Sequence, residues 1–340
     1  MMRDLLGRLI EGEDLGFEAV ASAVGSIVQE EVSPAQVGAF LTAMRLKGET
    51  QEEIAGAATA LRERAVAFPA TGLFNAIDTC GTGGDGAGTV NVSTLSALVA
   101  AGAGVKVAKH GNRAVSSKCG SADLLASLGV KVDASPTTAA RCLDEANFAF
   151  LFAPLYHPAM KAVAPFRAEM GFRTLFNMIG PLCNPAGVRK QLLGVFSEDL
   201  LPLMAGVLGR LGCDRAMVVS SLDGLDELSI SSPTSVAELD EAGDVTFYQI
   251  DPVSFGIGPY EKDSLAGGTP EENAEISLEF LSGAGGPVRD AALLNAAAAI
   301  MLAGSVNHMA EGLEAAAQAV DSGAAMTVLE RVRDICREDA

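Results

Sequence analysis

The sequence predicts an α/β protein with two parts: a small all-helical domain at the N-terminus and a larger domain around a mainly parallel sheet. Apolar side chains in the first seventy residues repeat at helical spacing, and no strand-like alternation interrupts them. From Ala76 onward, short β-branched or aromatic runs alternate with helical stretches, which is typical of a parallel sheet crossed by helices.

The N-terminal part is expected to hold four helices. Apolar spacing indicates two of them, over Leu5–Ile10 and Val20–Val28. A third runs over Ser33–Lys47, since Ser and Pro at its start suit the cap and the first turn and Gly48 ends it. The segment Thr50–Glu53 has the form of a capping box and opens the fourth helix.

The second part alternates strand and helix patterns. The strand candidates are Val105–Lys109, Phe148–Phe152 and Ala216–Ser220. The helix candidates between them are Thr94–Ala103, Ala122–Leu128, Thr137–Ala146 and Leu200–Leu211. A hairpin is predicted from Val236–Leu239 and Val245–Ile250. The C-terminal end is helical again, over Val288–Ala303, Asn307–Asp321 and Ala325–Arg337.

Composition excludes several classes of protein. The 340-residue chain carries 24 Lys and Arg against 43 Asp and Glu, a formal net charge of −19, and 49 % of its residues are apolar. The acidic total disfavours nucleic-acid partners, and the apolar content excludes a disordered chain. No signal peptide is evident, and the most apolar segment, Ala291–Val306, is shorter than the ~18 residues of a membrane span. Six scattered cysteines without a C-x-x-C pair predict buried thiols in a reducing compartment, the cytoplasm.

The strongest motif is the glycine-rich segment Asp78–Thr94, in which five of the eight residues Gly81–Gly88 are glycine. Bare backbone N–H groups in such a loop form an anion nest, and the helix that opens at Ser93 adds positive potential, so we expect a phosphate site. The match to the dinucleotide pattern G-x-G-x-x-G is weak, because the next strand supplies no acidic residue for a ribose. The lack of G-K-[ST] excludes a P-loop. A glycine-rich turn without a ligand is the plain alternative.

A second segment, Lys109–Asp123, follows a predicted strand and precedes a predicted helix, where open α/β sheets bind ligands. It gathers three cations and three hydroxyls: Lys109, Arg113, Lys118, Ser116, Ser117 and Ser121. Taken singly, each lysine is a solvated surface charge, but together they predict a second anion-contact segment. Ser121 also has a simpler interpretation, as the N-cap of the helix that follows.

Two further segments carry single residues of interest. His157 and Arg167 lie ten residues apart, about 80° in helical projection, although Pro165 disturbs that geometry. An arginine suits a planar carboxylate, whereas a histidine before proline is usually a turn residue. The pair Asp226-Glu227 follows a strand candidate, and such oxygen ligands suit Mg²⁺ held partly by substrate phosphate. A solvated acidic loop is the alternative there.

Together these segments resemble the anthranilate phosphoribosyltransferases of tryptophan biosynthesis over almost the whole chain. The motifs are GTGGDG with NVST, KHGNRAVSSKCGSAD, YHPAMK with a later Arg and FNMIGPLCNPA, and DGLDE. The resemblance implies a helical domain over residues 1–72, joined by helices from about 160–190, and an α/β catalytic domain over 73–340. That fold is shared with pyrimidine nucleoside phosphorylases. The implied reaction joins anthranilate to 5-phosphoribosyl diphosphate (PRPP) with Mg²⁺ and releases pyrophosphate, in a homodimer. Association with anthranilate synthase stays open.

The resemblance also implies roles for individual residues. The PRPP site is expected to contain Gly81, Gly84, Asp85, Thr89, Asn91, Val92, Ser93, Thr94, Lys109, His110, Gly111, Asn112, Arg113, Ala114, Val115, Ser116, Ser117 and Ser121. Anthranilate is expected to contact Gly81, Asn112, His157 and Arg167, and Mg²⁺ to bind Ser93, Asp226 and Glu227. No acid or base is assigned. His110 and Arg167 would position the substrate, because catalysis is expected to rest on positioning and leaving-group stabilisation.

The sequence departs from the family pattern at two places. Ser220-Ser221-Leu222 stands where His-Gly is common, and Cys119 stands where Ser is frequent; neither removes an expected ligand. The rivals are a related phosphoribosyltransferase that has lost anthranilate, a nucleoside phosphorylase that uses inorganic phosphate, and a nucleic-acid-binding relative. Asn112, His157 and Arg167 argue against the first, the Asp-Glu pair against the second, and the net charge against the third.

Overall fold

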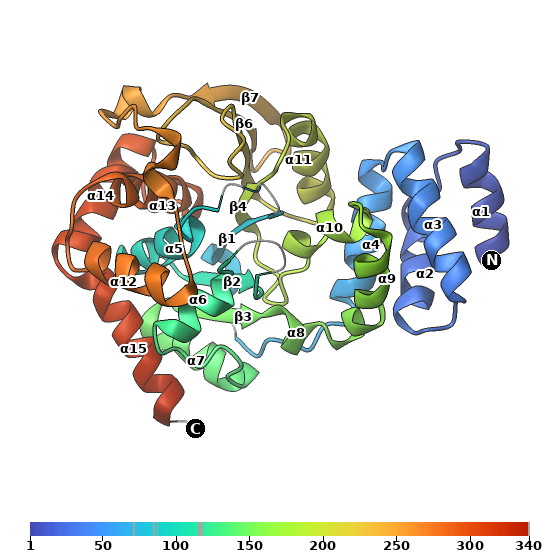
Figure 1. Ribbon diagram of the computed structural model, residues 1–340, viewed down its shortest axis with the longest axis horizontal. Helices are drawn as coiled ribbons and strands as arrows, with labels where there is room; N and C mark the ends of the chain where they lie inside the picture. The colour runs from blue at the N-terminus through green and yellow to red at the C-terminus, as the bar shows by residue number, and fades with distance from the viewer. Residues whose placement is uncertain (71, 84–85, 87, 115–117, 339–340) are drawn as a thin grey trace.

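The computed structural model describes residues 1–70, 72–83, 86, 88–114 and 118–338. Its N-terminal part consists of α1 (Met2–Ile10), α2 (Phe17–Val28), α3 (Pro34–Lys47) and α4 (Gln51–Arg62), as the sequence predicts. The expected capping box is present, because Glu53 N donates to Thr50 Oγ1 at 3.3 Å and Thr50 N donates to Glu53 Oε2 at 2.8 Å. Figure 1 shows these helices in blue at one end of an elongated molecule.

The larger part is built on a seven-stranded sheet in the order β3-β2-β1-β4-β5-β6-β7. The first five strands along the chain run parallel, and β6 and β7 extend the sheet as an antiparallel hairpin. The strands are β1 (Ile77–Gly81), β2 (Val107–Gly111), β3 (Phe148–Phe152), β4 (Lys190–Gly194), β5 (Arg215–Ser221), β6 (Thr234–Leu239) and β7 (Val245–Ile250). The predicted fold class and the predicted hairpin are confirmed.

Strands β1 and β4 lie at the centre of the sheet, yet the sequence pattern did not predict them. β4 begins with Lys190 and Gln191, which a buried strand normally avoids. Both are satisfied by partners outside the strand: Lys190 Nζ donates to Ala303 O at 2.6 Å, and Gln191 Nε2 donates to Pro181 O at 2.8 Å and to Cys80 Sγ of β1 at 3.0 Å. β1 likewise lacks a β-branched run, because it contains a buried aspartate and ends in glycine.

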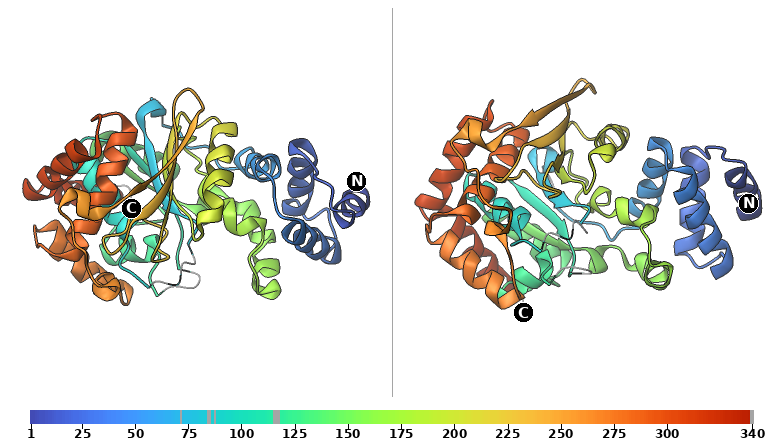
Figure 2. Two further views of the ribbon diagram at one scale, coloured as in Figure 1. Left: turned by 90° about the horizontal axis from the view of Figure 1, so that it is seen from above. Right: turned by 45° about the horizontal axis from the view of Figure 1, so that its top comes forward.

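Helices cover both faces of the sheet (Figure 2). Those of the larger part are α5 (Val92–Gly102), α6 (Ser121–Ser127), α7 (Pro136–Ala146), α8 (Ala153–Tyr156), α9 (Ala164–Met170), α10 (Leu175–Met178), α11 (Leu201–Arg210), α12 (Pro270–Leu281), α13 (Pro287–Ala303), α14 (Met309–Asp321) and α15 (Ala324–Glu338). All but α12 and the short helices α8–α10 correspond to predicted helices. Among the described residues, no helix is both long and apolar enough to span a membrane.

The start of α6 differs from the prediction. Its N-cap residue is Gly120, whose N–H donates to the carboxylate of Asp123 at 3.0 Å. The Ser121 hydroxyl instead donates to Asn112 O at 3.2 Å. The interpretation of Ser121 as an N-cap is therefore wrong, and this side chain fastens the loop that follows β2.

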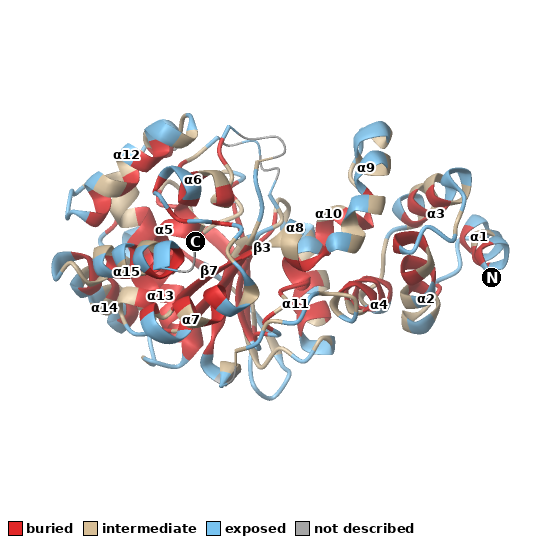
Figure 3. Cartoon of the chain, turned by 90° about the horizontal axis from the view of Figure 1, so that it is seen from below, coloured by how far each residue is buried: buried red, intermediate tan, exposed pale blue. Residues whose placement is uncertain are grey.

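The two faces of the sheet contribute to different hydrophobic cores. On β5, Met217 and Val219 pack with α5 and α13, whereas Ala216 and Val218 pack with α11 and the N-terminal helices. This is the alternation that a pleated strand requires. The second core also takes in apolar residues between β3 and β4, where α9 and α10 lie beside α3 (Figure 1). Figure 3 shows the buried sheet between helices whose outer faces are exposed. The domain division near residue 72 stays a prediction.

The order of the strands creates a point at which the chain changes direction within the sheet. After β1 the chain adds β2 and β3 on one side, and β4 then returns to the other side of β1. Gly81 and Gly194, the last residues of β1 and β4, are register partners. Ligands of open α/β sheets bind beyond the carboxyl ends of the strands at such a point. The fold therefore directs attention to the residues around Gly81 and Gly194.

Candidate active site

Two carboxylates occupy this end of the sheet. Asp226 and Glu227 follow β5, and backbone N–H groups orient both. Gly83 N donates to Asp226 Oδ2 at 2.9 Å, and Ser93 N donates to Glu227 Oε1 at 2.9 Å. Because Ser93 lies in the first turn of α5, Glu227 sits at the positive end of a helix dipole. The structure thus brings Ser93, Asp226 and Glu227 together, and they are not a merely solvated acidic loop.

Glycine is required at both strand ends because Asp226 lies directly against them. A Cβ built on Gly81 would stand 2.3 Å from Asp226 Oδ2, and a Cβ on Gly194 would stand 1.5 Å from Asp226 O. Ordinary van der Waals contact begins near 3.4 Å. The ends of β1 and β4 therefore form a cradle that only glycine leaves open for the acidic segment.

The donor set at this place fits a magnesium ion. No group of three or more His, Cys, Asp or Glu side chains gathers within the described part of the chain. The protein therefore offers two carboxylates and the Ser93 hydroxyl. Mg²⁺ is usually held by one or two carboxylates, with waters and substrate phosphates completing its shell. The residues present suit an ion that the substrate helps to bind.

Lys109 lies beneath this site rather than on the surface. Its side chain is 2 % exposed, and Nζ donates to Thr79 O and, at 3.2 Å, to Ser93 Oγ. Burial lowers the pKa of Lys109, and the nearby negative charge of Asp78 opposes that shift. A solvated surface lysine is therefore the wrong interpretation here. Lys109 supports Ser93 from below and adds positive charge under the acidic pair.

Asp123 holds the second basic segment in a compact loop. Its carboxylate accepts from Ala114 N at 2.8 Å and pairs with Arg113 Nη1 at 2.8 Å. Burial works against the charged carboxyl, but these bonds prevail and leave the pKa of Asp123 below its usual range. Arg113 lies with its guanidinium carbon 5.9 Å from the centre of the Phe152 ring. Five expected PRPP residues fall outside the described residues: Gly84, Asp85, Val115, Ser116 and Ser117.

Asn91 links the two expected phosphate segments to each other. Its Nδ2 donates to Cys119 O at 3.0 Å, and its Oδ1 accepts from Asn273 Nδ2 at 3.1 Å. Asn273 is almost fully buried in α12, a helix that the sequence pattern did not predict. The Asn91 amide therefore joins loops from three parts of the chain, in addition to the ligand role that the resemblance implies.

The remaining expected residues of the first segment surround the start of α5. Thr89 forms an isolated β-bridge with Ala266, and Val92 and Thr94 are buried in the first turn of the helix. The Thr94 hydroxyl has no hydrogen-bond partner among the described residues. The Val92 and Thr94 side chains face the protein, and their backbone N–H groups donate to Val90 O at 2.8 Å and to Asn91 O at 2.9 Å. These two residues therefore shape the start of the helix.

His110 and His157 form a buried aromatic pair. Their ring centroids lie 5.2 Å apart at an interplanar angle of 66°. Burial lowers both pKa values, that of His110 to about 3, so both rings are neutral near pH 7. His157 Nε2 donates to Cys183 O at 2.7 Å. His157 is therefore a packed residue of the site region, and its interpretation as a simple turn residue is wrong.

Arg167 does not share a helix with His157. His157 follows α8, and a 3-10 turn over Pro158–Ala162 separates it from α9, which carries Arg167. The projection of both residues onto one helix is therefore wrong. No described residue forms an ion pair with Arg167. Burial lowers the pKa of its half-buried guanidinium, which remains available for a ligand carboxylate. Asn112, the other expected anthranilate contact, is exposed just after β2.

Two buried polar residues under the site were not predicted. Asp78 is fully buried in β1, and burial raises its pKa to about 6. Asn184 is 3 % exposed, and its Nδ2 donates to Asp78 Oδ2 at 2.8 Å. Both residues stand inside the motifs described above. A single sequence gave no sign, however, that side chains 106 positions apart would meet.

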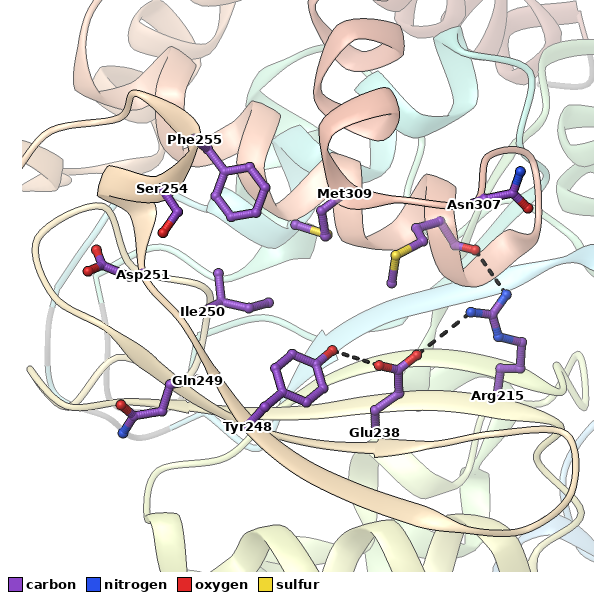
Figure 4. Close-up of a pocket in the computed structure, with 11 residues that line it drawn as sticks. Arg215, Glu238, Tyr248, Gln249, Ile250, Asp251, Ser254, Phe255, Asn307 and Met309 are labelled. Atoms are coloured by element: carbon purple, nitrogen blue, oxygen red, sulfur yellow. Dashed lines mark hydrogen bonds and ion pairs between the residues drawn. The ribbon is translucent and has the colours of Figure 1, made fainter.

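A cavity at the antiparallel end of the sheet lies away from these residues (Figure 4). It has a volume of about 410 Å³ and is lined by β7, the turn after it, and residues near α13 and α14. Arg215, at the edge of the cavity, is the first residue of β5, and Asp226 follows the last residue of that strand. The two ends of β5 lie about 20 Å apart at ~3.3 Å per residue. Three polar side chains of the cavity are paired with one another, since Tyr248 OH donates to Glu238 Oε2 at 2.6 Å and Glu238 faces Arg215 at 3.7 Å. No predicted site residue lines this cavity.

The fold and the site define the class of protein. The sequence model of a glycosyl transferase family a/b domain matches residues 73–326, and that of the family's helical bundle domain matches residues 3–65. The acidic pair at the carboxyl ends of β1, β4 and β5 therefore lies in a two-domain glycosyl transferase.

Similar proteins and solved structures identify the family within this class. The chain is 50 % identical over 335 residues to an anthranilate phosphoribosyltransferase of Brevibacillus brevis, with 98 % of each chain covered. It is 49 % identical to that of Symbiobacterium thermophilum, with 98 % and 97 % covered. The crystal structure of the Thermus thermophilus anthranilate phosphoribosyltransferase matches with a TM-score of 0.92 at 43 % identity, over 98 % and 99 % of the two chains. The Saccharomyces cerevisiae enzyme in complex with PRPP and Mg matches with a TM-score of 0.90 at 31 % identity, over 99 % and 98 %. The chain belongs to the anthranilate phosphoribosyltransferase family.

Proposed function

We infer that the protein transfers the phosphoribosyl group of PRPP to the amine of anthranilate and releases pyrophosphate. The observation that carries this conclusion is an identity of about one half to anthranilate phosphoribosyltransferases over nearly the full length of both chains. The acidic pair at the carboxyl ends of β1 and β4 supports it. The reaction is that of a pentosyltransferase in tryptophan biosynthesis.

The chain supplies positioning and charge rather than a strong base. Pyrophosphate leaves the anomeric carbon, so positive charge develops on the ribose and negative charge on the leaving group. When bound, Mg²⁺ offsets the negative charge of the diphosphate. Asp226, Glu227 and Ser93 would hold that ion, and Lys109 would keep Ser93 in place from below. Backbone N–H groups of the Gly81–Thr94 segment and the Lys109–Ser121 loop would bind the phosphates and ribose.

Anthranilate has a carboxylate, an aromatic ring and a neutral amine, and so requires other contacts than the diphosphate of PRPP. Arg167 would bind its carboxylate with a bidentate pair of hydrogen bonds, with Gly81 and Asn112 also in contact. His110 and His157 would flank the aromatic ring as neutral, buried rings. Neutral histidines suit an amine that acts as nucleophile, because a neutral imidazole does not protonate the amine and leaves its lone pair free. Binding geometry therefore supplies most of the rate enhancement.

The oligomeric state, the location in the cell and a partner protein are proposed from the family resemblance alone. We propose that the enzyme is a homodimer and that it acts in the cytoplasm. All six cysteines are free thiols in the structure, in agreement with a reducing compartment. Association with anthranilate synthase is the weaker expectation and needs a separate binding experiment.

The metal assignment provides a sharp test of the proposed function. Replacing both carboxylates, Asp226→Asn with Glu227→Gln, is expected to abolish Mg²⁺-dependent turnover and to leave the protein folded. Glu238→Gln, which changes an acidic residue of the remote cavity, is the matched control and is expected to keep the turnover of the wild type. Inorganic phosphate and a nucleoside, offered instead of PRPP and anthranilate, are expected to give no reaction. Undiminished turnover of the double variant would refute the metal site.

A further inference from the structure

We propose that Asp78 and Asn184 are a positioning pair that aligns the two histidines of the anthranilate site with the phosphate loop after β2. This proposal rests on the proposed function. It assigns a role to two residues that are not themselves expected to contact the metal or the substrates. The evidence is a set of buried hydrogen bonds that converge on one carboxylate and one amide.

Asp78 binds two separate segments with its two oxygens. Its Oδ1 accepts from His110 N at 3.2 Å, and its Oδ2 accepts from Asn184 Nδ2 at 2.8 Å. The residue is fully buried, and a buried carboxylate is costly unless hydrogen bonds and opposite charge compensate for lost water. Lys109, the neighbour of His110, provides the opposite charge. One side chain of β1 is therefore connected to both functional residues at the end of β2.

Asn184 binds three groups with its amide. Besides Asp78, its Nδ2 donates to Ala108 O at 2.8 Å, and its Oδ1 accepts from Ala186 N at 2.9 Å. Nδ2 thus uses both of its protons, one on β1 and one on β2, and Oδ1 fixes the turn of its own segment. This side chain ties the loop before β4 to the two strands beside it.

The same loop holds the histidines. Cys183, next to Asn184, presents the carbonyl to which His157 Nε2 donates at 2.7 Å. The His110 ring packs edge-on against His157, and its Nε2 has no hydrogen-bond partner among the described residues. His110 is therefore held twice: its backbone N–H by Asp78 directly, and its ring through contact with His157, which the loop anchored by Asn184 holds. A shift of this loop would move both rings together.

Removing the Asn184 amide should impair the binding of anthranilate more than that of PRPP. Asn184→Ala removes the three bonds of the amide and changes no expected metal group, and His110 is the one expected PRPP residue that the pair holds. We expect the KM for anthranilate to rise by about tenfold or more, because displacements of about 1 Å have effects of this size on positioned groups. The KM for PRPP is expected to stay within about twofold of the wild type.

Reversing the pair gives a second variant. Asp78→Asn alone places an NH₂ group against either His110 N–H or Asn184 Nδ2, a mismatch of two donors. Combining it with Asn184→Asp restores one donor and one acceptor across the pair, but a carboxylate oxygen then faces Ala108 O, which loses its donor. We expect the double swap to have an anthranilate KM lower than that of Asp78→Asn and still higher than that of the wild type.

The control variant is Lys190→Met. Lys190 is also a buried polar residue of the central sheet, bonded to Ala303 O at the opposite end of β4. This change is expected to lower thermal stability and to leave both KM values unchanged. It separates a general loss of stability from the positioning of the histidines.

A spectroscopic readout makes the test independent of turnover. The chain has three histidines, so the ring signals of His110, His157 and His308 can be assigned by single substitutions in NMR spectra. Asn184→Ala is expected to shift the ring signals of His110 and His157 and to leave that of His308 in place. Unshifted signals, or an equal rise of both KM values, would overturn the proposal. If the wild type itself did not consume anthranilate, the proposed function would fail instead.

Discussion

The substitution Gly81→Ala tests the architecture of the metal site through a single methyl group. The new Cβ would stand 2.3 Å from Asp226 Oδ2 and 2.9 Å from Asp226 Cγ. Ordinary contact begins near 3.4 Å, so the carboxylate oxygen must retreat by about 1 Å. Such a movement also breaks the hydrogen bond from Gly83 N.

That displacement is large compared with what a metal site tolerates. Mg²⁺ binds oxygen at about 2.0–2.1 Å in near-ideal octahedral geometry, and ligand distances in a sound site vary by only about 0.2 Å. We therefore expect Gly81→Ala to lower kcat/KM by roughly a hundredfold and to require more Mg²⁺ for half-maximal rate. The φ angle of Gly81 is not positive, so alanine is not excluded by the backbone itself.

The assay follows anthranilate fluorescence while the Mg²⁺ concentration is varied, with thermal unfolding measured in parallel. Gly38→Ala in α3 is the control, because its Cβ would meet no atom within 4 Å. It is expected to keep wild-type kinetics and to unfold at an equal or slightly higher temperature. If Gly81→Ala showed the same Mg²⁺ dependence and kcat/KM as the wild type, the close approach of Asp226 to β1 would play no part in catalysis.

Three further predictions concern other parts of the chain. Arg167→Ala is expected to raise the anthranilate KM by roughly 10- to 100-fold and to leave the PRPP KM unchanged. The rise corresponds to the loss of charge-assisted hydrogen bonds worth about 1.5–3 kcal/mol. An equal rise of both KM values would contradict the role of Arg167 in binding the carboxylate. The pKa of His110 is lowered to about 3 in the folded protein, so its contribution to stability is complete above the unfolded pKa of about 6.5 and is lost as pH falls toward 3. Between pH 6.5 and 5 the unfolding temperature of His110→Gln should therefore fall less than that of the wild type. Asp78 contributes in the opposite direction, but equally in both proteins. Parallel pH profiles of the two proteins would exclude a neutral, buried His110. Thr50→Ala is expected to lose about 1 kcal/mol of stability with the capping box, without a change in kcat/KM, as chemical denaturation and the activity assay can show.

The fold was largely predictable where local pattern and tertiary role agree. The N-terminal helices follow from apolar spacing and from cap residues such as Thr50, and β3 was predicted residue for residue because five apolar residues lie there in a row. β1 and β4 were missed because Asp78, Lys190 and Gln191 are polar residues that become favourable in a strand only through distant partners, which are Asn184, Ala303 and Cys80. Local propensity cannot register a partner that lies a hundred residues away.

In the site, too, some residues could be predicted from local sequence and others depend on distant partners. Its glycine-rich and acidic segments stand out because their residue types are unusual and lie close together in the chain, and the structure brings Gly83, Asp226 and Ser93 to one place. The burial of Lys109 could not be seen, because a lysine beside a loop has the same sequence whether it faces water or the core. The pairing of Asp78 with Asn184 could not be predicted for a related reason: it joins two residues 106 positions apart in the chain.

The most direct test of the central claim is a time course with the purified protein, PRPP, Mg²⁺ and anthranilate. The account predicts loss of anthranilate fluorescence that requires both PRPP and Mg²⁺, with one pyrophosphate released for each anthranilate consumed. No consumption of anthranilate at saturating concentrations of all three components would contradict it.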